Sequence, residues 1–393
     1  MADEAKRIVV LGLGGGGGKI AATLAADPAL DSAAMLAVAD TDQRALEFLE
    51  GIVQIPLGRD WEFQGGCGGS SNKGEKAATV SSNDLRQLVI GAELVIVVAA
   101  LGAGTGAGAA RVMARHLREL KIMGIFVATL PFSFEGNWRC HQAEKDLELL
   151  RGISDTVLAI PNDLLFASLP ASTAAEQAFD LSNRMLAKGV NGLMRLPQAR
   201  SILTVDFAAL RNLLREKPSL CTLGVGHGTG PDRWQEVVRD FFACPLVGGP
   251  ENLAKTDAAV LTLIGGEGLS LGEIQACMTS IQQQFPKTTR VQVGAYSDPR
   301  MQESVQLTGL LCRFAGEPSI PQAARENAAA AGTVIQGRRS GRKKAGGEGL
   351  QGELQLQEQA LGIFASSGPT TVDGENLDIP TFQRRGIYLD LGQ

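Results

Sequence analysis

Apolar residues between Arg7 and about Ile160 gather in short continuous runs, separated by longer stretches in which apolar and polar residues alternate at helical spacing. These runs predict five strands: Ile8 to Leu13, Met35 to Asp40, Leu94 to Leu101, Ile125 to Leu130 and Thr156 to Pro161. Continuous apolar strands separated by helices are typical of a parallel sheet covered on both faces. We therefore expect a doubly wound α/β domain over residues 1–171.

A long helical pattern follows, and its apolar positions can share one side of a helix. They are Phe179, Met185, Leu186, Val190 and Leu193. This pattern predicts a central helix over residues 172–196 that buries one face between two domains.

Further apolar runs begin after the central helix, at residues 221–226, 259–265, 291–296 and 305–311, with helical stretches between the first three. They predict a second, smaller α/β domain over residues 197–316. Composition then changes to alanine, glycine, arginine and glutamine with little to build a core, which predicts a flexible linker over residues 317–375. Apolar and charged residues return at residues 376–393, where we expect a peptide that docks onto a partner.

The composition sets broad limits on function. With 393 residues, of which 44% are hydrophobic and 20% charged, the chain can form two domains with sizeable cores. A formal net charge of -5 gives no general electrostatic reason to expect nucleic-acid binding. No apolar stretch reaches the length of a membrane span, and the N-terminus lacks a leader-like apolar core, so we expect a cytoplasmic protein without direct membrane insertion.

The cysteines give little indication of chemistry. The sequence has six cysteines without a CxxC pair, and only three histidines. We therefore expect reduced thiols, and neither a metal site nor a disulfide framework.

The segment GLGGGGGK, residues 12–19 and here named the first glycine segment, follows the first predicted strand and precedes an alanine-rich helix. Glycine lets the backbone approach an anion closely, and a helix N-terminus offers free N–H groups and a positive dipole end. The spacing also matches the GxGxxG pattern of dinucleotide sites, with Asp40 or Asp42 available for a ribose. Alone, the segment therefore predicts a phosphate site for either kind of ligand.

A second glycine segment, GAGTGAG at residues 102–108, follows the predicted strand that ends at Leu101 and precedes another helix. Its glycines and alanines surround a single hydroxyl, that of Thr105. A dinucleotide alone does not explain a second phosphate-binding segment in the same sheet. A polyphosphate held by both segments explains it directly. Either segment alone could also be a set of tight turns.

Further motifs, in the same order and with matching separations, resemble the FtsZ family of tubulin-like cell-division GTPases. The first glycine segment resembles the family's first glycine loop, ADTDQRAL its second loop and GAGTGAG its GGGTGTG signature, and TLPFSFEGNWR, IPNDLL and FDLSN follow. The resemblance covers residues 7–315 and returns in LDIPTFQRR, which is similar to the family's tail peptide. It implies the tubulin/FtsZ fold: a doubly wound GTP-binding domain joined by a long central helix to a smaller α/β domain, with a flexible C-terminal tail.

The resemblance also implies which residues contact GTP or GDP, with Mg²⁺ possible at the nucleotide. Glu135 and Arg139 match positions that contact ribose and phosphates, Phe179 the aromatic that stacks on the base, and Asn183 the reader of the base edge. Without the family, Glu135 and Arg139 would be interpreted as an exposed ion pair and Phe179 as a core aromatic. The full implied set is Gly15, Gly16, Gly17, Gly18, Lys19, Asp42, Gly68, Gly102, Gly104, Thr105, Gly106, Gly108, Glu135, Arg139, Asn162, Phe179 and Asn183.

In this family, hydrolysis is completed in trans by a loop from the second domain of the neighbouring subunit. The corresponding catalytic segment, ARSILTVDFAALR at residues 199–211, resembles GLINVDFADVR. Thr204 and Asp206 are the implied catalytic residues, and Ala209 stands where the family has a second aspartate. Because such a carboxylate helps to orient or deprotonate water, its loss should slow hydrolysis more than binding.

Three other departures lie in the glycine segments. Lys19 replaces an asparagine and could add positive charge against phosphate. Ala103 and Ala107 replace a glycine and a threonine, and an added methyl group is tolerated only where φ is negative.

The resemblance implies assembly through a contact between the catalytic segment and the nucleotide pocket at opposite ends of the subunit. Such a contact is heterologous and propagates head to tail into a filament at the mid-cell division site. The tail peptide is expected to dock onto membrane-tether division proteins such as FtsA, with folding back onto its own domain as the alternative. The expected docking residues are Asp378, Ile379, Pro380, Phe382, Arg384 and Arg385.

Three function classes remain open. A Z-ring-type GTPase accounts for both glycine segments, the catalytic segment and the tail. A GTP-binding scaffold or regulator that does not hydrolyse GTP is compatible with Ala209. An NAD-dependent Rossmann oxidoreductase accounts only for the first glycine segment and the acids near residue 40.

Overall fold

The computed structural model describes residues 8–314, except 28–29, 31–33, 48, 50, 60–64, 167–168, 171, 198–201 and 217–218. The chain divides into two units, residues 1–336 and 337–393. In the second unit only the antiparallel pair of β11 (Thr371–Val372) and β12 (Glu375–Asn376) is described. The six expected docking residues therefore lie outside the described residues, as does nearly all of the expected linker.

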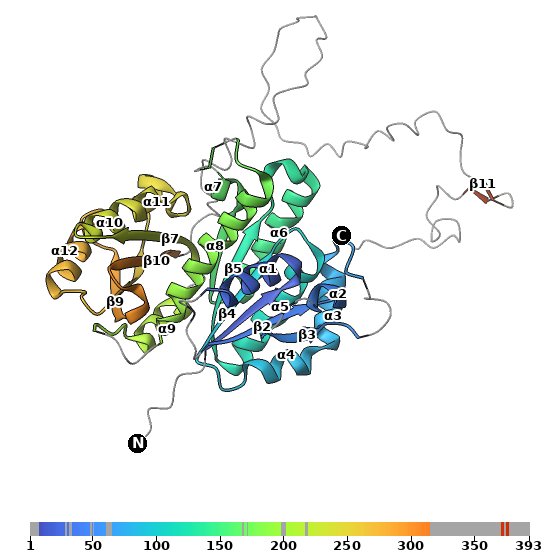
Figure 1. Ribbon diagram of the computed structural model, residues 1–393. Helices are drawn as coiled ribbons and strands as arrows, with labels where there is room; N and C mark the ends of the chain where they lie inside the picture. Colours follow the sequence, from blue (N-terminus) through green and yellow to red (C-terminus); the bar gives the residue numbers. More distant parts are fainter. Residues whose placement is uncertain are drawn as a thin grey trace, which may run out of the picture. The chain divides into compact units, whose positions relative to one another are not determined.

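A ten-stranded sheet with the order β3-β2-β1-β4-β5-β6-β7-β10-β8-β9 runs through the described part of the first unit (Figure 1). The first six strands in this order are all parallel to their neighbours. They are β3 (Val53–Pro56), β2 (Ala34–Asp40), β1 (Ile8–Leu13), β4 (Leu94–Ala100), β5 (Met123–Leu130) and β6 (Thr156–Pro161).

Helices cover both faces of these parallel strands. Alternate side chains of β4 point to opposite faces, so that Ile96 joins one hydrophobic core and Val97 the other. Helices α1 (Gly14–Ala25), α2 (Gln43–Leu46), α7 (Asn162–Phe166) and α8 (Ala175–Met194) pack into the first core. Helices α3 (Ser71–Val80), α4 (Ser82–Val89), α5 (Gly104–Leu120) and α6 (Asn137–Ile153) pack into the second core. The doubly wound α/β fold expected from the sequence is confirmed.

The second half of the chain extends the same sheet. Strand β7 (Ser219–Thr229) pairs in parallel with the first residues of β6, and β10 (Ser304–Phe314) is antiparallel to both β7 and β8 (Ala258–Gly265). Strand β9 (Arg290–Ser297) closes the edge in parallel with β8. Helices α9 (Phe207–Glu216), α10 (Arg233–Ala243), α11 (Gly249–Ala254) and α12 (Leu271–Gln282) complete this half. The sequence pattern predicts the strands but not the pairing that makes one sheet of the two halves.

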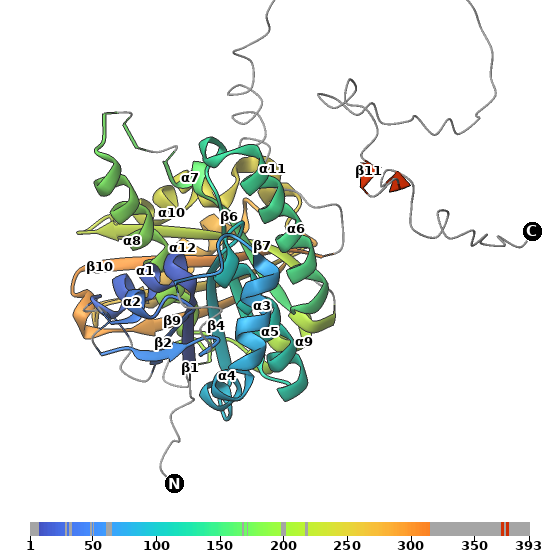
Figure 2. The ribbon, with the colours of Figure 1, turned by 90° about the vertical axis from the view of Figure 1, so that its right-hand side faces the viewer.

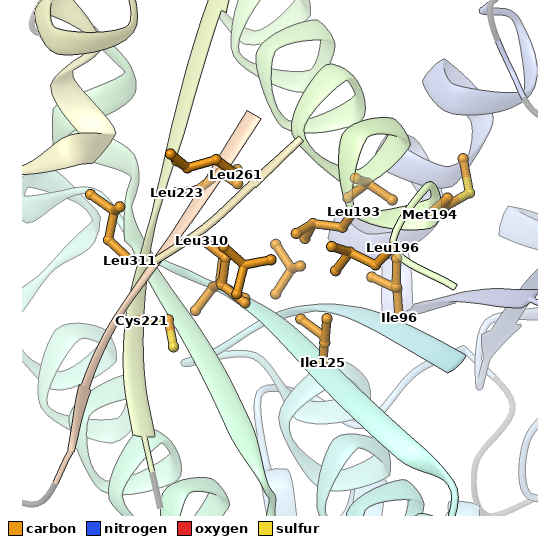
Figure 3. Close-up of a cluster of buried hydrophobic side chains, with 14 of the residues drawn as sticks. Ile96, Ile125, Leu193, Met194, Leu196, Cys221, Leu223, Leu261, Leu310 and Leu311 are labelled. Atoms are coloured by element: carbon orange, nitrogen blue, oxygen red, sulfur yellow. The ribbon is translucent and has the colours of Figure 1, made fainter. Parts of the chain in front are cut away.

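Helix α8 lies between the two halves, as Figures 1 and 2 show. Leu193 and Met194, near its C-terminal end, are at most 2% exposed and share a core with Ile125 of β5 and Leu310 of β10 (Figure 3). The predicted apolar face of the central helix is therefore buried over its second half. Phe179, near the helix start, is 47% exposed, so its assignment to this buried face was wrong.

No helix of the described residues combines the length and hydrophobicity that a membrane crossing requires. The six cysteines are all free thiols. Within the described ranges, no cluster of three or more His, Cys, Asp and Glu side chains could hold a metal ion.

Candidate functional site

The first glycine segment forms the junction between β1 and α1. Helix α1 begins at Gly14, so Gly15, Gly16, Gly17, Gly18 and Lys19 belong to its first turns and not to a preceding loop. The N–H groups of a helix's first turn have no partner within the helix, and the dipole places partial positive charge there. Gly15, Gly16 and Lys19 are exposed. This end of α1 therefore suits an anion.

The second glycine segment is built in the same way, because α5 begins at Gly104 directly after β4 and the turn at Gly102. Strands β1 and β4 are neighbours in the sheet, so the two helix N-termini meet. Gly14 has φ 68°, and a Cβ on it would lie 3.0 Å from the backbone nitrogen of Gly106. A side chain at Gly14 would therefore strain the backbone and force the two segments apart.

The two alanines of the second glycine segment fit this geometry. Ala103, which adds a methyl group in place of glycine, has φ -116°, so the condition of a negative φ is met there. Ala107 is smaller than the threonine that it replaces, lies within α5 and is not among the residues with positive φ.

Three segments meet at the Thr105 hydroxyl. Thr105 Oγ1 lies 2.7 Å from Thr41 Oγ1, and both oxygens lie 3.6 Å from Cys67 Sγ. The carboxylate of Asp40, at the end of β2, also interacts with Thr105, and burial raises the pKa of this carboxyl above 3.8. Thr41 and Cys67 were not among the expected site residues, and Asp40 was considered only for a ribose. The structure therefore places a compact polar hub, formed by Asp40, Thr41, Cys67 and Thr105, beside the second glycine segment.

Two expected nucleotide ligands lie on loops near this hub. The Asp42 carboxylate accepts hydrogen bonds from the backbone N–H of Arg44 at 3.2 Å and from Arg44 Nε at 3.3 Å, and so caps α2. Gly68 is exposed, with φ 55°, in the turn that follows Cys67. Asp42 therefore has a structural role, and nucleotide contact by either residue stays a prediction.

Glu135 and Arg139 form an ion pair at the start of α6, with 2.8 Å between Glu135 Oε2 and Arg139 Nη1. Glu135 Oε1 also accepts the backbone N–H of Phe132 at 2.8 Å, which fixes the carboxylate in the 3₁₀ turn η2 (Ser133–Glu135). The Glu135 side chain is 20% exposed and the Arg139 side chain 43% exposed. The ion pair considered from the sequence exists, and it leaves the Arg139 side chain within reach of solvent.

An aromatic cluster lies where α8 begins. The Phe179 ring meets Phe132 and Phe166 edge-on, with centroid distances of 5.5 and 5.4 Å, and is half exposed. Asn183 is partly buried one turn further along α8, and Asn162 begins α7 after β6. The core interpretation of Phe179 is therefore wrong, because its ring keeps a face or edge accessible to a ligand.

The catalytic segment lies at the other end of α8. Asp206 is exposed, and its Oδ1 accepts the backbone N–H of Ala209 at 2.9 Å, which caps α9. Thr204 is also exposed, and the preceding Leu203 bridges to Ala295 of β9. Because α8 has 20 residues, it separates its two ends by about 30 Å. Asp206 and Thr204 thus follow the end of α8 that lies opposite the aromatic cluster.

Comparison with known proteins gives consistent matches. The model of the Tubulin/FtsZ family, GTPase domain, matches residues 7–170, and that of the FtsZ family, C-terminal domain, matches residues 220–314. Cell division protein FtsZ 1 of Archaeoglobus fulgidus is 32% identical over 304 residues, which cover 77% of this chain and 81% of that protein.

Solved structures share the fold. The empty FtsZ dimer of M. jannaschii has a TM-score of 0.71 at 25% identity, covering 81% of this chain and 96% of that one. The GTPγS-bound protofilament of CetZ2 from Haloferax volcanii has a TM-score of 0.64 at 20% identity, covering 83% and 98% of the two chains.

Proposed function

Because the chain belongs to the Tubulin/FtsZ family of GTPases, we propose that it binds GTP across its two glycine segments and forms head-to-tail filaments in cell division. In this proposal, GTP is hydrolysed between successive subunits. The observation that carries it is the meeting of two helix N-termini, α1 and α5, at adjacent strands, because together they can hold a polyphosphate.

The parts of GTP are assigned to different elements. The phosphates lie on the first turns of α1 and α5, where Thr105 offers a hydroxyl to the terminal phosphates. Glu135 accepts from the ribose hydroxyls, and Arg139 donates to phosphate. The base stacks on the exposed part of Phe179, and Asn183 and Asn162 supply amide groups to its edge. The half-exposed aromatic ring supports this placement of the base.

Mg²⁺ fits the same end of the sheet. The Asp40 carboxylate and the hydroxyls of Thr41 and Thr105 are hard oxygen donors, which Mg²⁺ prefers beside phosphate oxygens. When bound, Mg²⁺ neutralises phosphate charge that develops during hydrolysis. Asp40, Thr41 and Thr105 are therefore the residues proposed to hold it.

Hydrolysis requires two subunits in this proposal. Asp206 is exposed and follows the C-terminal end of α8, a helix about 30 Å long, whereas the aromatic cluster lies where α8 begins. The carboxylate that orients the attacking water therefore comes from the next subunit in this proposal. Ala209 offers no second carboxylate there, and we expect slow turnover. The contact joins different surfaces of two copies and so propagates a filament.

The division role rests on the family relationship, and so does placement at mid-cell. The docking of the tail peptide on membrane-tether division proteins rests on the resemblance of LDIPTFQRR to the family's tail. A second candidate function is a GTP-binding scaffold of a division filament that does not hydrolyse GTP. Ala209 is the specific observation that favours it.

Two measurements test the proposal. Nucleotide released from the denatured purified protein is identified by chromatography, and the native protein is sedimented with GTP and with GDP. The proposal expects a guanine nucleotide and more pelleted protein with GTP. A bound dinucleotide, or equal sedimentation with GTP and GDP, would contradict it.

A further inference from the structure

Asp146 is a buried carboxylate that the proposed function does not use. It lies in α6 and is 1% exposed, and burial raises the pKa of its carboxyl above 3.8. One carboxylate oxygen, Oδ2, has no hydrogen-bond partner of good geometry among the described residues. Burial of a carboxylate costs free energy of folding unless hydrogen bonds or opposite charges compensate it. The groups around Asp146 therefore indicate its role.

The face of α6 that carries Asp146 lies against the second glycine segment. Gly102, where this segment begins, has φ 73°, and a Cβ on it would lie 2.7 Å from the Arg139 carbonyl oxygen and 3.1 Å from Ala143 Cβ. Arg139, Ala143 and Asp146 are spaced at i, i+4 and i+7, on one side of the helix. The N–H of Gly102 interacts with the Asp146 carboxylate and lowers its pKa, against the larger effect of burial.

Asp146 also reaches the start of α3. Gln142 Nε2 donates to Asp146 Oδ1 and to Ser71 Oγ, both at 3.3 Å, and the Ser71 hydroxyl interacts with the carboxylate as well. Ser71 is the first residue of α3 and directly follows the loop that carries Cys67. The Asp146 side chain is therefore linked both to the start of the second glycine segment and to the start of α3, and both of these border the polar hub.

Neighbouring arginine charge offsets that of Asp146. Arg111 of α5 is 7% exposed, lowers the pKa of the carboxyl, and pairs with Glu75 of α3 at 3.4 Å. A buried negative charge behind a phosphate site would otherwise repel the ligand. Because Arg111 lies beside it, Asp146 can accept from the Gly102 N–H and the Ser71 hydroxyl while its charge repels a bound phosphate less.

We propose that Asp146 is a positioning residue for the nucleotide site, because it holds the starts of the second glycine segment and of α3 in the arrangement that binds phosphate. The inference rests on the proposed binding of GTP by this site. Loss of the carboxylate should therefore reduce the affinity for nucleotide more than the stability of the fold, because the binding site is no longer held in its binding arrangement before the ligand arrives.

The test compares Asp146→Ala and Asp146→Asn with the wild-type full-length chain. Asp146→Ala is expected to raise the Kd for GTP, measured by calorimetry, about tenfold or more, because hydrogen bonds to a charged group are lost. Asp146→Asn keeps an acceptor oxygen and should recover part of the affinity. In phosphate release, the KM should rise in Asp146→Ala while kcat changes less than twofold, because the catalytic segment is untouched.

The control is Ser154→Ala, which removes a hydrogen bond to the Leu150 carbonyl at the far end of α6. It should lower the melting temperature without changing the Kd. An unchanged Kd in Asp146→Ala, or a Kd that follows the melting temperature in both variants, would overturn the proposal. If Asp146→Ala does not fold, Gln142→Leu is expected to raise the Kd in the same direction, and an unchanged Kd there overturns the proposal too.

Amide exchange separates this inference from the proposed function. Without nucleotide, the Gly102 amide should exchange faster in Asp146→Asn or Asp146→Ala than in the wild type. Unchanged exchange would refute the positioning role even if GTP binds. Faster exchange in a protein that binds no GTP would refute the proposed function and leave the Gly102 contact in place.

Discussion

Replacement of Phe179 by alanine removes the ring on which the guanine base is proposed to stack. The loss of folding stability and the loss of binding free energy arise from different contacts of this ring and can be measured separately. Full burial of a phenylalanine side chain contributes about 1.5–3 kcal/mol, and this ring is 47% exposed, so roughly half of that applies. Its two edge contacts, with Phe132 and Phe166, add about 0.5 kcal/mol each, the weak end of the range for aromatic pairs, because the ring is half exposed. We therefore expect a loss of about 2 kcal/mol, below the 3–5 kcal/mol typical of a core aromatic.

The effect of this substitution on binding is separate from its effect on folding. Stacking of a base on an aromatic side chain contributes about 1–3 kcal/mol, which corresponds to roughly a 5- to 160-fold increase in Kd. Fluorescence anisotropy of a labelled GTP measures the Kd, and urea unfolding measures the free energy of unfolding. Phe179→Tyr keeps the ring and should bind GTP within about twofold of the wild type.

The matched control is Leu181→Ala, which removes a 40% exposed side chain from the same helix. It should leave the Kd unchanged. A loss of 3–5 kcal/mol in Phe179→Ala with an unchanged Kd would show that the ring serves the core and would refute its role in stacking.

Three further predictions concern hydrolysis, stability and metal. Ala209→Asp restores a carboxylate and should raise phosphate release per subunit about tenfold or more, with the Kd for GTP unchanged, and an unchanged rate would show that this carboxylate does not limit turnover. The pKa of Glu273 is lowered from 4.5 to about 2, first by the hydrogen bond from Arg233 and further by those from Ser270. After screening by solvent, the Arg233 pair should contribute about 1–2 kcal/mol above pH 4.5, which is lost as the pH falls toward 2. In urea unfolding, the difference in free energy of unfolding between Arg233→Met and the wild type should therefore shrink as the pH is lowered. A difference that does not change with pH would show that the ion pair is not its cause. Asp40→Asn should reduce the gain in GTP affinity on adding Mg²⁺ at least fivefold, measured against EDTA, and an equal gain in both proteins would exclude Asp40 as a ligand.

The strands at the centre of the sheet could be predicted because both of their faces are buried. In β1 and β4 nearly every residue is apolar, which makes a continuous run in the sequence. Strand β3 was missed because it has four residues, of which Val53 and Gln54 are exposed, so it has neither the length nor the pattern of a buried strand. The pairing of β6 with β7 joins segments about 60 residues apart, and no local pattern encodes it.

The parts of the candidate site that could be predicted are those formed by residues adjacent in the sequence. The glycine segments follow strands directly, and their composition indicates phosphate. The helices begin earlier than expected, at Gly14 and Gly104, because glycine in a first turn does not prevent helix formation. The contact between Thr41 and Thr105 spans 64 positions, and the link from Gln142 to Ser71 spans 71, so both depend on the tertiary fold.

The central claim is that GTP bound by one subunit is hydrolysed with the help of Asp206 from the next. Steady-state phosphate release over a range of protein concentrations, with pelleting in the same samples, tests it most directly. The rate per subunit should be near zero at low concentration and rise together with the pelleted fraction, and Asp206→Asn should pellet with GTP but release little phosphate. A rate per subunit that is the same at all concentrations, or unchanged in Asp206→Asn, would contradict it.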